Sequence, residues 1–257
     1  MNLDRIRMTF SLALMLGWQD VRQAYRRSSF GPFWITAGMT VQILTIAFVF
    51  GMIFKTDMQD FLPFIASSII FWSLIAATIS EGCMSFIGGE AIIKQLNIPL
   101  LTHVIRVIWR NLINFAHNII ILPLAFLVVL HGLNWNAFLA LPGMVLLIIN
   151  LSWMALILAL VSARFRDIPP IVSSLLMIAL YLTPVMWYPS LIGNNQLAHF
   201  LLGLNPFYHL LQIVRSPLLG ESPTLENWSI SIVLGIVGWS MAALVFAKFR
   251  TAIAYWV

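Results

Sequence analysis

Six apolar runs, each about 20 residues long, are the feature that most constrains how this chain folds. They are residues Phe33–Phe54, Phe61–Gly82, Leu112–Leu130, Phe138–Ala163, Ile171–Tyr188 and Ile230–Ala247. A helix of about 20 residues is about 30 Å long, which matches the hydrocarbon core of a bilayer. Charged residues make up only 9% of the chain, against about 25% in soluble domains. The sequence therefore predicts an all-α, multi-pass membrane protein and excludes a soluble globular enzyme.

A seventh apolar segment, Leu197–Leu219, is interrupted by Asn205-Pro206. Its halves are too short to cross a bilayer, so we expect two short helices that enter one face of the membrane and return. If the chain crosses six times from a cytoplasmic N-terminus, every Lys and Arg except Lys55 and Arg215 lies on the cytoplasmic side. This positive-inside bias predicts that both termini are cytoplasmic.

Residues 5–29 are predicted to form an amphipathic helix in the cytoplasmic interface of the membrane. Apolar side chains recur along it at helical spacing: Leu14, Trp18, Val21 and Tyr25. Residues 30–32 (Phe-Gly-Pro) then turn the chain into the first run. Two interpretations of Arg26 and Arg27 stay open. The pair either anchors the helix by positive charge or binds an anionic headgroup or pyrophosphate.

Residues 84–99 lie in the longest cytoplasmic loop. A diglycine ends the preceding helix, and residues 90–97 can form two helical turns before Ile98-Pro99 stops them. A short helix held between two membrane helices either receives force from a partner or is a passive connector. A second cytoplasmic turn, residues 164–170, places Asp167 to cap the helix that follows.

Two side-chain clusters each have a structural and a functional interpretation. A polar stripe shares one helix face at the start of the third run: His103, Arg106, Arg110, Asn114 and His117. It either pairs with partners such as Glu81 or lines a wet pathway. Three aromatic residues lie near the outer end of the fifth run: Tyr181, Trp187 and Tyr188. They form either an interfacial aromatic belt or a gate whose rings stack on planar groups or sugars.

Several signatures of chemistry are missing from the sequence. It has no Gly-rich phosphate loop, which excludes nucleotide hydrolysis by that route. No pair of carboxylates lies deep in the runs, which argues against a proton- or sodium-driven carrier. Cys83 is the single cysteine, and the basic residues are not clustered as in nucleic-acid-binding proteins. We expect no catalytic residue, metal site or cofactor in the chain, and energy from another subunit.

Four stretches, the last in two parts, resemble the membrane subunit of type-two ABC exporters, most closely the permeases that export O-antigen and related lipid-linked polysaccharides. They are residues 20–34 (DVRQAYRRSSFGPFW), 93–99 (IKQLNIP), 162–168 (SARFRDI), and 182–185 (LTPV) with 205–209 (NPFYH). Phe30 stands where the family often has Leu. The resemblance implies one membrane domain, residues 1–257, with six transmembrane helices, an N-terminal interface helix and a re-entrant periplasmic hairpin before the last span.

The resemblance further implies an exporter driven by a separate ATPase. A homodimer of the chain would assemble with two cytoplasmic ABC ATPase subunits, which bind ATP and Mg. The cargo would be a polysaccharide on undecaprenyl pyrophosphate, moved across the bacterial inner membrane, and nucleic acid is not an expected partner. Other functions stay open: export of capsule polymer, teichoic acid or small molecules, or an enzyme acting on a lipid phosphate.

Roles for individual residues follow from the same resemblance. Residues 189–228 would form the periplasmic gate hairpin. The cargo headgroup would meet Arg26, Arg27, Gly31 and Trp34. The channel or gate aromatics would be Tyr181, Trp187 and Tyr188. The ATPase would press on Glu90, Lys94, Gln95, Arg166 and Asp167.

Overall fold

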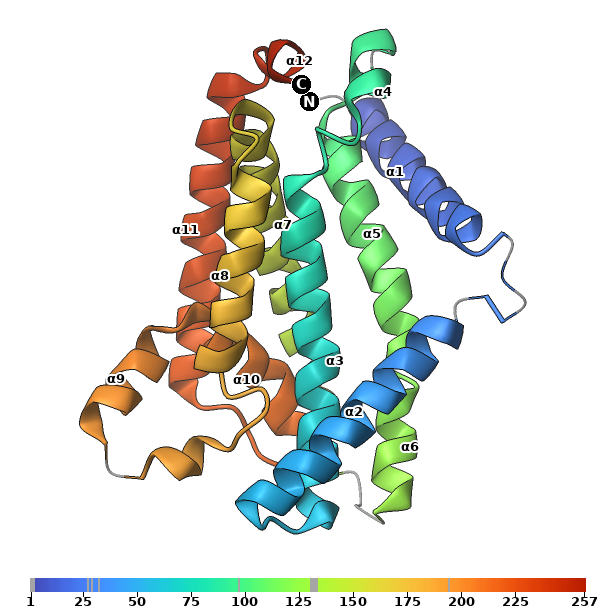
Figure 1. The fold of residues 1–257 in the computed structure, drawn as a ribbon. Helices are drawn as coiled ribbons and strands as arrows, with labels where there is room; N and C mark the ends of the chain where they lie inside the picture. Colours follow the sequence, from blue (N-terminus) through green and yellow to red (C-terminus); the bar gives the residue numbers. More distant parts are fainter. Residues whose placement is uncertain are drawn as a thin grey trace.

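The computed structural model describes residues 3–26, 28, 30–31, 33–96, 98–129, 134–193 and 195–257, and all regular secondary structure within these ranges is helical (Figure 1). The all-α prediction is therefore confirmed. The helices are α1 (Leu3–Ala24), α2 (Phe33–Phe54), α3 (Met58–Cys83), α4 (Glu90–Gln95), α5 (Leu101–Asn118), α6 (Ile121–Val128), η1 (Trp135–Leu139), α7 (Ala140–Arg164), α8 (Ile168–Leu182), η2 (Pro189–Ile192), α9 (Gln196–Leu204), α10 (Pro206–Leu218), α11 (Leu225–Phe249) and α12 (Ile253–Trp256).

The long helices run alternately between two ends of the molecule. At the upper end in Figure 1 lie α4, α12, the turn between α7 and α8, and the beginning of α1; we call this the α4 end. At the opposite end, the α10 end, lie η2, α9 and α10, between the end of α8 and the beginning of α11 (Figure 1). The beginning of α1 and the end of α12 therefore both lie at the α4 end (Figure 1).

Within the described residues, five helical segments are long and apolar enough to cross a membrane: Phe33–Phe54, Met58–Cys83, Leu101–Val128, Trp135–Arg164 and Leu225–Phe249. These segments make the chain a multi-pass membrane protein. Helix α8 is apolar but has only 15 residues, or about 22 Å at 1.5 Å per residue. Helices α9 and α10 meet at an angle of 84°. The crossing by α8 and the re-entrant path of α9 and α10 stay predictions.

The third crossing begins earlier than its apolar run suggests. The run starts at Leu112, whereas α5 begins at Leu101 and includes the whole polar stripe. The expected boundary was wrong because a polar face does not end a helix when its side chains find partners on neighbouring helices. The segment is interrupted between α5 and α6, where Pro123 lacks the N–H that would bond to Ile119 four residues earlier.

Helix α3 is the centre of the bundle, and α2 lies at its periphery. The two spans have the same mean hydropathy, 2.0, yet 83% of the α3 window is buried inside the protein and only 17% of the α2 window. The main hydrophobic core surrounds α3, and a second cluster joins α5, α7 and α12 towards the α4 end. Burial thus separates two helices that composition does not distinguish.

The segment after α8 is fixed by the helices at the α10 end. Helix α8 ends at Leu182, and Thr183 is extended (ψ 134°), as expected for a residue that precedes proline. The fifth apolar run, which continues to Tyr188, is therefore helical in α8 only as far as Leu182. Asn205 caps α10 by accepting from the Phe207 N–H (3.0 Å), and its side-chain amide donates to the Thr183 hydroxyl (2.9 Å). This amide links the turn between α9 and α10 to the end of α8.

Candidate functional site

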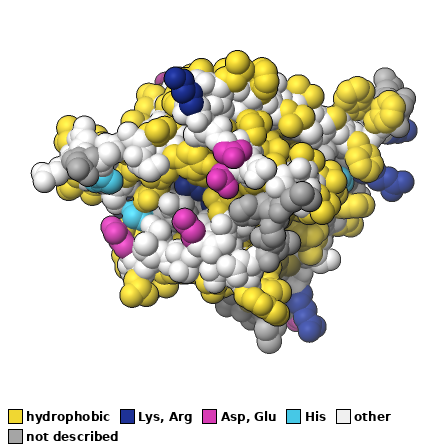
Figure 2. Space-filling model, turned by 90° about the horizontal axis from the view of Figure 1, so that it is seen from below, with side chains coloured by type: hydrophobic (Ala, Val, Ile, Leu, Met, Phe, Trp, Pro, Cys, Tyr) yellow, Lys and Arg dark blue, Asp and Glu magenta, His cyan; other side chains and the backbone are white. Residues whose placement is uncertain are grey.

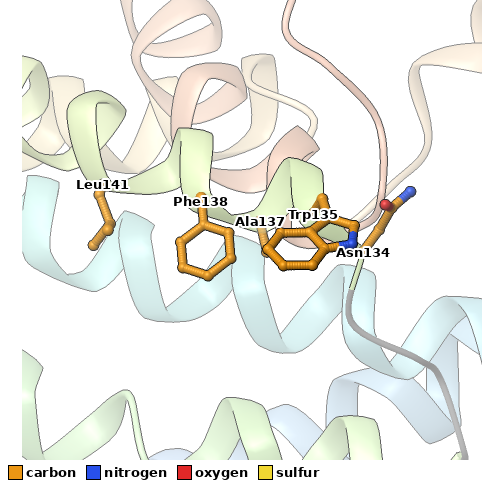
Figure 3. Close-up of a pocket in the computed structure, with 5 residues that line it drawn as sticks. All are labelled: Asn134, Trp135, Ala137, Phe138 and Leu141. Carbon is orange, nitrogen blue, oxygen red and sulfur yellow. The ribbon is translucent and has the colours of Figure 1, made fainter.

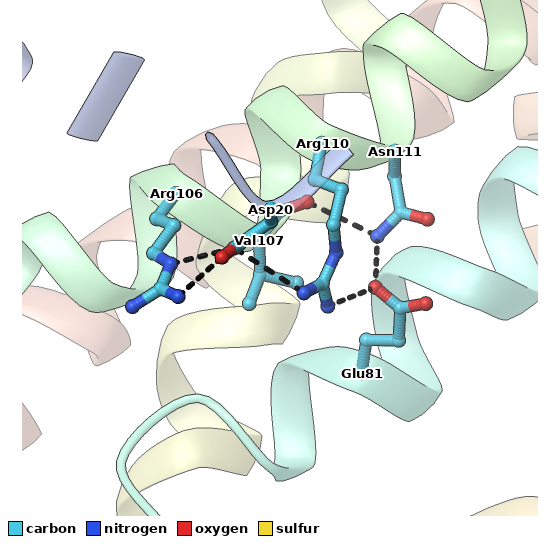
Figure 4. A network of polar contacts seen from close by, with 6 residues as sticks. All are labelled: Asp20, Glu81, Arg106, Val107, Arg110 and Asn111. Atoms are coloured by element: carbon cyan, nitrogen blue, oxygen red, sulfur yellow. Dashed lines mark hydrogen bonds and ion pairs between the residues drawn. The ribbon is translucent and has the colours of Figure 1, made fainter. Parts of the chain in front are cut away.

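A network of charged side chains at the α4-end half of the bundle joins α1, α5 and α3 (Figure 4). Arg106 donates to both carboxylate oxygens of Asp20, from Nε at 2.6 Å and from Nη2 at 2.5 Å. Arg110 reaches the same carboxylate at 3.4 Å and donates to Glu81 at 2.7 Å. Asn111 also donates to Glu81, at 2.8 Å. Two arginines and two acids from three helices therefore form one contiguous set.

The side chains of the network are partly buried, so their ion pairs matter for stability. The side chains of Asp20 and Arg106 are only 15% and 23% exposed. Charge pairs in such surroundings interact more strongly than surface pairs, and loss of one member leaves its partner uncompensated. The prediction that the stripe pairs with Glu81 is confirmed by Arg110, whereas His117 contacts its own helix at the Ile113 carbonyl (2.8 Å).

Asp20 was not predicted as a partner of the stripe. Its carboxylate lies 86 residues before Arg106 in sequence, so helical spacing gives no indication that they meet. The available signal was an acid among the basic residues at the end of the interface helix, at a position that continues its protein-facing side.

The face of α1 that packs on α5 consists of small side chains. The buried positions are Thr9, Ala13, Gly17 and Val21. At Gly17 a Cβ atom would lie 2.9 Å from the Trp109 ring and 3.0 Å from the Arg106 carbonyl, so only glycine permits this approach. Trp18 is 57% exposed and Leu14 is also exposed. The expected apolar face is therefore divided: Val21 faces α5, while Leu14 and Trp18 point outward.

The residues predicted to contact an ATPase lie together only in part. Glu90 and Lys94 form an ion pair of 2.7 Å along α4. The Lys94 ammonium lowers the pKa of the Glu90 carboxyl, and the positive charge of Arg166 lowers it further, which relates α4 to the α7–α8 turn. Gln95 is exposed. Asp167 occupies the N-cap position of α8, but its side chain makes no capping bond because its backbone is already helical (φ −82°, ψ −13°).

Of the predicted headgroup residues, Arg26 and Gly31 lie between α1 and α2, and Trp34 lies in the first turn of α2. Arg26 is exposed, and Arg27 lies outside the described residues. Gly31 has φ +56°, a conformation that favours glycine, and its N–H bonds the Ser28 hydroxyl (3.1 Å). Trp34 follows directly and is 61% exposed. The structure thus brings Gly31 and Trp34 together, and in the described part of the chain no contact joins Arg26 to them.

The three predicted gate aromatics occupy two different environments. Tyr181 is exposed, and its carbonyl accepts from the Trp187 indole at 3.2 Å. Tyr188 instead packs into the protein, with its ring centroid 4.3 Å from that of Phe64 and 5.6 Å from that of Phe61. Tyr181 therefore faces away from the bundle with the half-buried Trp187 beside it, whereas Tyr188 belongs to the packing around α3.

A separate apolar surface lies at the start of α7 (Figure 3). Trp135 and Phe138 stack with ring centroids 5.8 Å apart and an interplanar angle of 28°. Together with Leu141 they line a shallow depression of about 480 Å³. Exposed Trp side chains at the end of a membrane helix are typical of the boundary between lipid and water.

Arg215 is fully buried in α10. It was counted only as a basic residue of a non-cytoplasmic segment, and its burial was not predicted. The signal that indicates its burial is its own helix, where Gln212 and Ser216 flank it at helical spacing amid apolar residues.

Comparison with known proteins agrees with this architecture. Residues 12–219 match the ABC-2 type transporter family. The chain is 24% identical over 203 residues to the O-antigen export system permease protein RfbA of Myxococcus xanthus, covering 78% of this chain and 77% of that protein. It is 21% identical over 247 residues to the protein of the same name from Klebsiella pneumoniae, covering 94% of this chain and 93% of that protein. These matches confirm the resemblance, and the chain belongs to the ABC-2 type transporter family as a membrane transport subunit rather than an enzyme.

Proposed function

We propose that this chain is the transmembrane subunit of an ATP-driven exporter that moves a polysaccharide linked to undecaprenyl pyrophosphate, such as O-antigen, across the bacterial inner membrane. The observation that carries the proposal is the near full-length similarity to O-antigen export permeases within the ABC-2 type transporter family. ATP and Mg bind to a separate ATPase, and this chain provides the path.

In the proposed topology the chain crosses six times, with the α4 end in the cytoplasm. Basic residues gather at that end: Lys94, Arg164, Arg166, Lys248 and Arg250. Exposed acids gather at the α10 end, which Figure 2 views directly: Asp57, Asp60, Glu221 and Glu226. This distribution supports a cytoplasmic α4 end. Helices α9 and α10 lie between the end of α8 and the beginning of α11 at one end of the molecule, which supports a re-entrant hairpin (Figure 1).

The proposed contact with the ATPase is α4 together with the neighbouring α7–α8 turn, through Glu90, Lys94, Gln95, Arg166 and Asp167. Helix α4 precedes α5, and α5 is joined to α1 and α3 by the charged network. A displacement of α4 therefore has a continuous route to the interface helix. Force applied at one cytoplasmic contact can then move the segment where cargo enters.

Cargo is proposed to enter at the segment between α1 and α2. A guanidinium group at Arg26 or Arg27 suits the pyrophosphate, and the exposed ring of Trp34 suits the lipid–water boundary. One chain of six helices is too small to enclose a sugar polymer, so we propose a homodimer around a two-fold axis. The exposed surfaces of α2 and α8 support pairing with a second copy.

A complementation experiment tests the function. Deletion of the gene should abolish surface polysaccharide and cause lipid-linked polymer to accumulate in the cytoplasmic leaflet, and the wild-type chain should restore export. Arg26→Gln should lower export about tenfold at normal protein level, because a charge-assisted bond to phosphate is lost. The matched control is Arg22→Gln, an exposed arginine in the last turn of α1, just before the segment that holds Arg26. Unchanged surface polysaccharide in the deletion strain would contradict the proposal.

A further inference from the structure

Arg215 is a buried charge near the α10 end of the bundle. Its side chain is 1% exposed, and no carboxylate among the described residues forms an ion pair with it. A guanidinium group stays protonated in proteins. Among the described residues only neutral groups bond to this charge directly, and the Glu221 carboxylate acts on it from beyond ion-pair distance.

The guanidinium group of Arg215 joins three separate parts of the chain. Its Nη1 donates to the Ser68 hydroxyl on α3 (2.9 Å) and to the Pro184 carbonyl beyond α8 (2.5 Å). Its Nη2 donates to Gln212 on its own helix (2.9 Å). The group also lies 4.5 Å from the centroid of the Phe64 ring, which favours a cation. All of these partners are uncharged.

Stability alone is a weak reason for such an arrangement. Burial of a charge without a counter-ion costs several kcal/mol, and an apolar side chain of similar size usually packs there at no loss. Ionisable residues inside membrane segments are mostly retained for function. The acceptors of Arg215 indicate a contact that can open. Hydrogen bonds to neutral groups can be exchanged for bonds to water, and this costs less free energy than separating a buried ion pair.

The element that Arg215 holds is the short segment Thr183–Val185. Thr183 and Val185 are both fully buried. Arg215 bonds the carbonyl of Pro184 between them, while Asn205 bonds the Thr183 hydroxyl (2.9 Å). Arg215 and Asn205, both from the α9–α10 pair, therefore bond to the residues that follow α8. His209 fixes the same pair to α11 through Asn227 (2.8 Å).

We propose that Arg215 is a positioning residue that holds α10 against α3 and the end of α8, and so keeps the export path closed at the α10 end between transport cycles. This inference rests on the proposed function. Because the acceptors are neutral, opening exchanges the hydrogen bonds of Arg215 for bonds to water and breaks no ion pair. These hydrogen bonds therefore prevent leakage between cycles and can still be broken when the ATPase acts.

Cysteine accessibility in spheroplasts tests this closure. Cys83 is replaced by Ala, and Val185→Cys then reports whether a membrane-impermeant maleimide reaches the segment that Arg215 holds. Lys55→Cys, exposed at the same end, is the control for reagent access. Ala159→Cys, buried in the cluster towards the α4 end, is the control for general packing.

With Arg215 intact we expect Val185→Cys to be protected. Arg215→Gln should raise its labelling rate about tenfold or more, because bonds from a charged donor are lost, with Ala159→Cys still protected. Arg215→Lys, which keeps the charge but lacks the planar fork, should give an intermediate rate. An unchanged rate in Arg215→Gln, or equal gains at Val185→Cys and Ala159→Cys, would overturn the proposal.

A milder pair of variants covers the case in which Arg215→Gln does not fold. Ser68→Ala removes one acceptor of Arg215, whereas Ser67→Ala removes a buried hydroxyl that bonds only within α3, to Pro63 and Phe64 carbonyls. We expect faster Val185→Cys labelling in Ser68→Ala and no change in Ser67→Ala; equal rates would contradict the role of Arg215. Labelling requires no cargo, so the role of Arg215 is tested independently of the proposed cargo. If the chain with Arg215 intact protects Val185→Cys but exports no polysaccharide, only the proposed choice of cargo is contradicted.

Discussion

Two arginine clusters of the molecule differ in how the positive charge is compensated. The cluster near the α4 end, built from Asp20, Arg106, Arg110 and Glu81, matches two cations with two anions. The cluster at Arg215 matches one cation with hydroxyl, carbonyl and amide oxygens. The first is suited to a permanent link, since its members cannot separate cheaply. The second is suited to a contact that opens and closes.

The largest effect is expected from breaking the charge-matched cluster. Asp20→Asn leaves Arg106 without its anion in a site where Asp20 is only 15% exposed, and we expect a loss of about 2–4 kcal/mol in unfolding free energy. Thermal unfolding of the purified chain, followed by tryptophan fluorescence, measures it. Asp4→Asn, an exposed acid on the same helix, is the control and should have no effect. Equal stability of the two variants would show that the cluster is not a structural link.

A smaller effect is expected from separating α1 from α5 without changing any charge. Gly17→Ala places a methyl group 2.9 Å from the Trp109 ring, and we expect a loss of about 1–2 kcal/mol because the helices must move apart. Gly38→Ala on α2, where nothing lies within 4 Å of the added atom, should be neutral or stabilising by about 0.5 kcal/mol. The same unfolding assay compares the two. A similar loss in both would indicate that close approach at Gly17 is unimportant.

At the second cluster, removal of one neutral acceptor should cost less than removal of an anion at the first. Ser68→Ala is expected to reduce the unfolding free energy by about 1 kcal/mol, since one bond from a charged donor is lost and the cation keeps its other acceptors. If Ser68→Ala destabilises the chain as much as Asp20→Asn, the distinction between a permanent and a releasable contact fails.

The smallest effect on stability is expected at the exposed ion pair of α4. Glu90→Gln should leave the unfolding temperature unchanged at neutral pH, because exposed pairs contribute little. The lowered pKa of Glu90 means that any contribution is complete above the ordinary carboxyl pKa of about 4.3 and is lost only as pH falls through the lowered value. Unfolding curves of the two proteins should therefore coincide from neutral pH to about pH 5. A clear difference in that interval would show that Glu90 has a buried partner in the folded chain.

The sequence predicted the elements better than it predicted their contacts. Apolar runs located the membrane helices, since a stretch of about 20 apolar residues has few other solutions. They misplaced the start of the third, because Arg106 and Arg110 interrupt the run without interrupting α5. The diglycine located the start of α4 correctly, because backbone restrictions act locally, whereas the helix ends at Gln95, two residues before the predicted end.

The contacts were harder to predict because their partners are distant in sequence. The amphipathic pattern identified α1 as a helix, yet it did not show that Gly17 and Asp20 face α5. Arg215 was placed in a hairpin on the non-cytoplasmic side, but its burial was not predicted, because its acceptor Ser68 is 147 residues away in sequence. A positive charge near the end of an apolar segment is compatible with either solvent or the protein interior, and only packing decides between them.

The low burial of helix α2 affects how this helix responds to the membrane. With 17% of its window covered by the rest of the chain, its tilt is set mainly by the thickness of the surrounding bilayer and by whatever lies alongside it. A thinner or thicker bilayer should therefore change the tilt of α2 while α3 stays in place. Because Gly31 and Trp34 lie at its beginning, the lipid composition of the membrane becomes a determinant of how these two residues are oriented at the membrane surface.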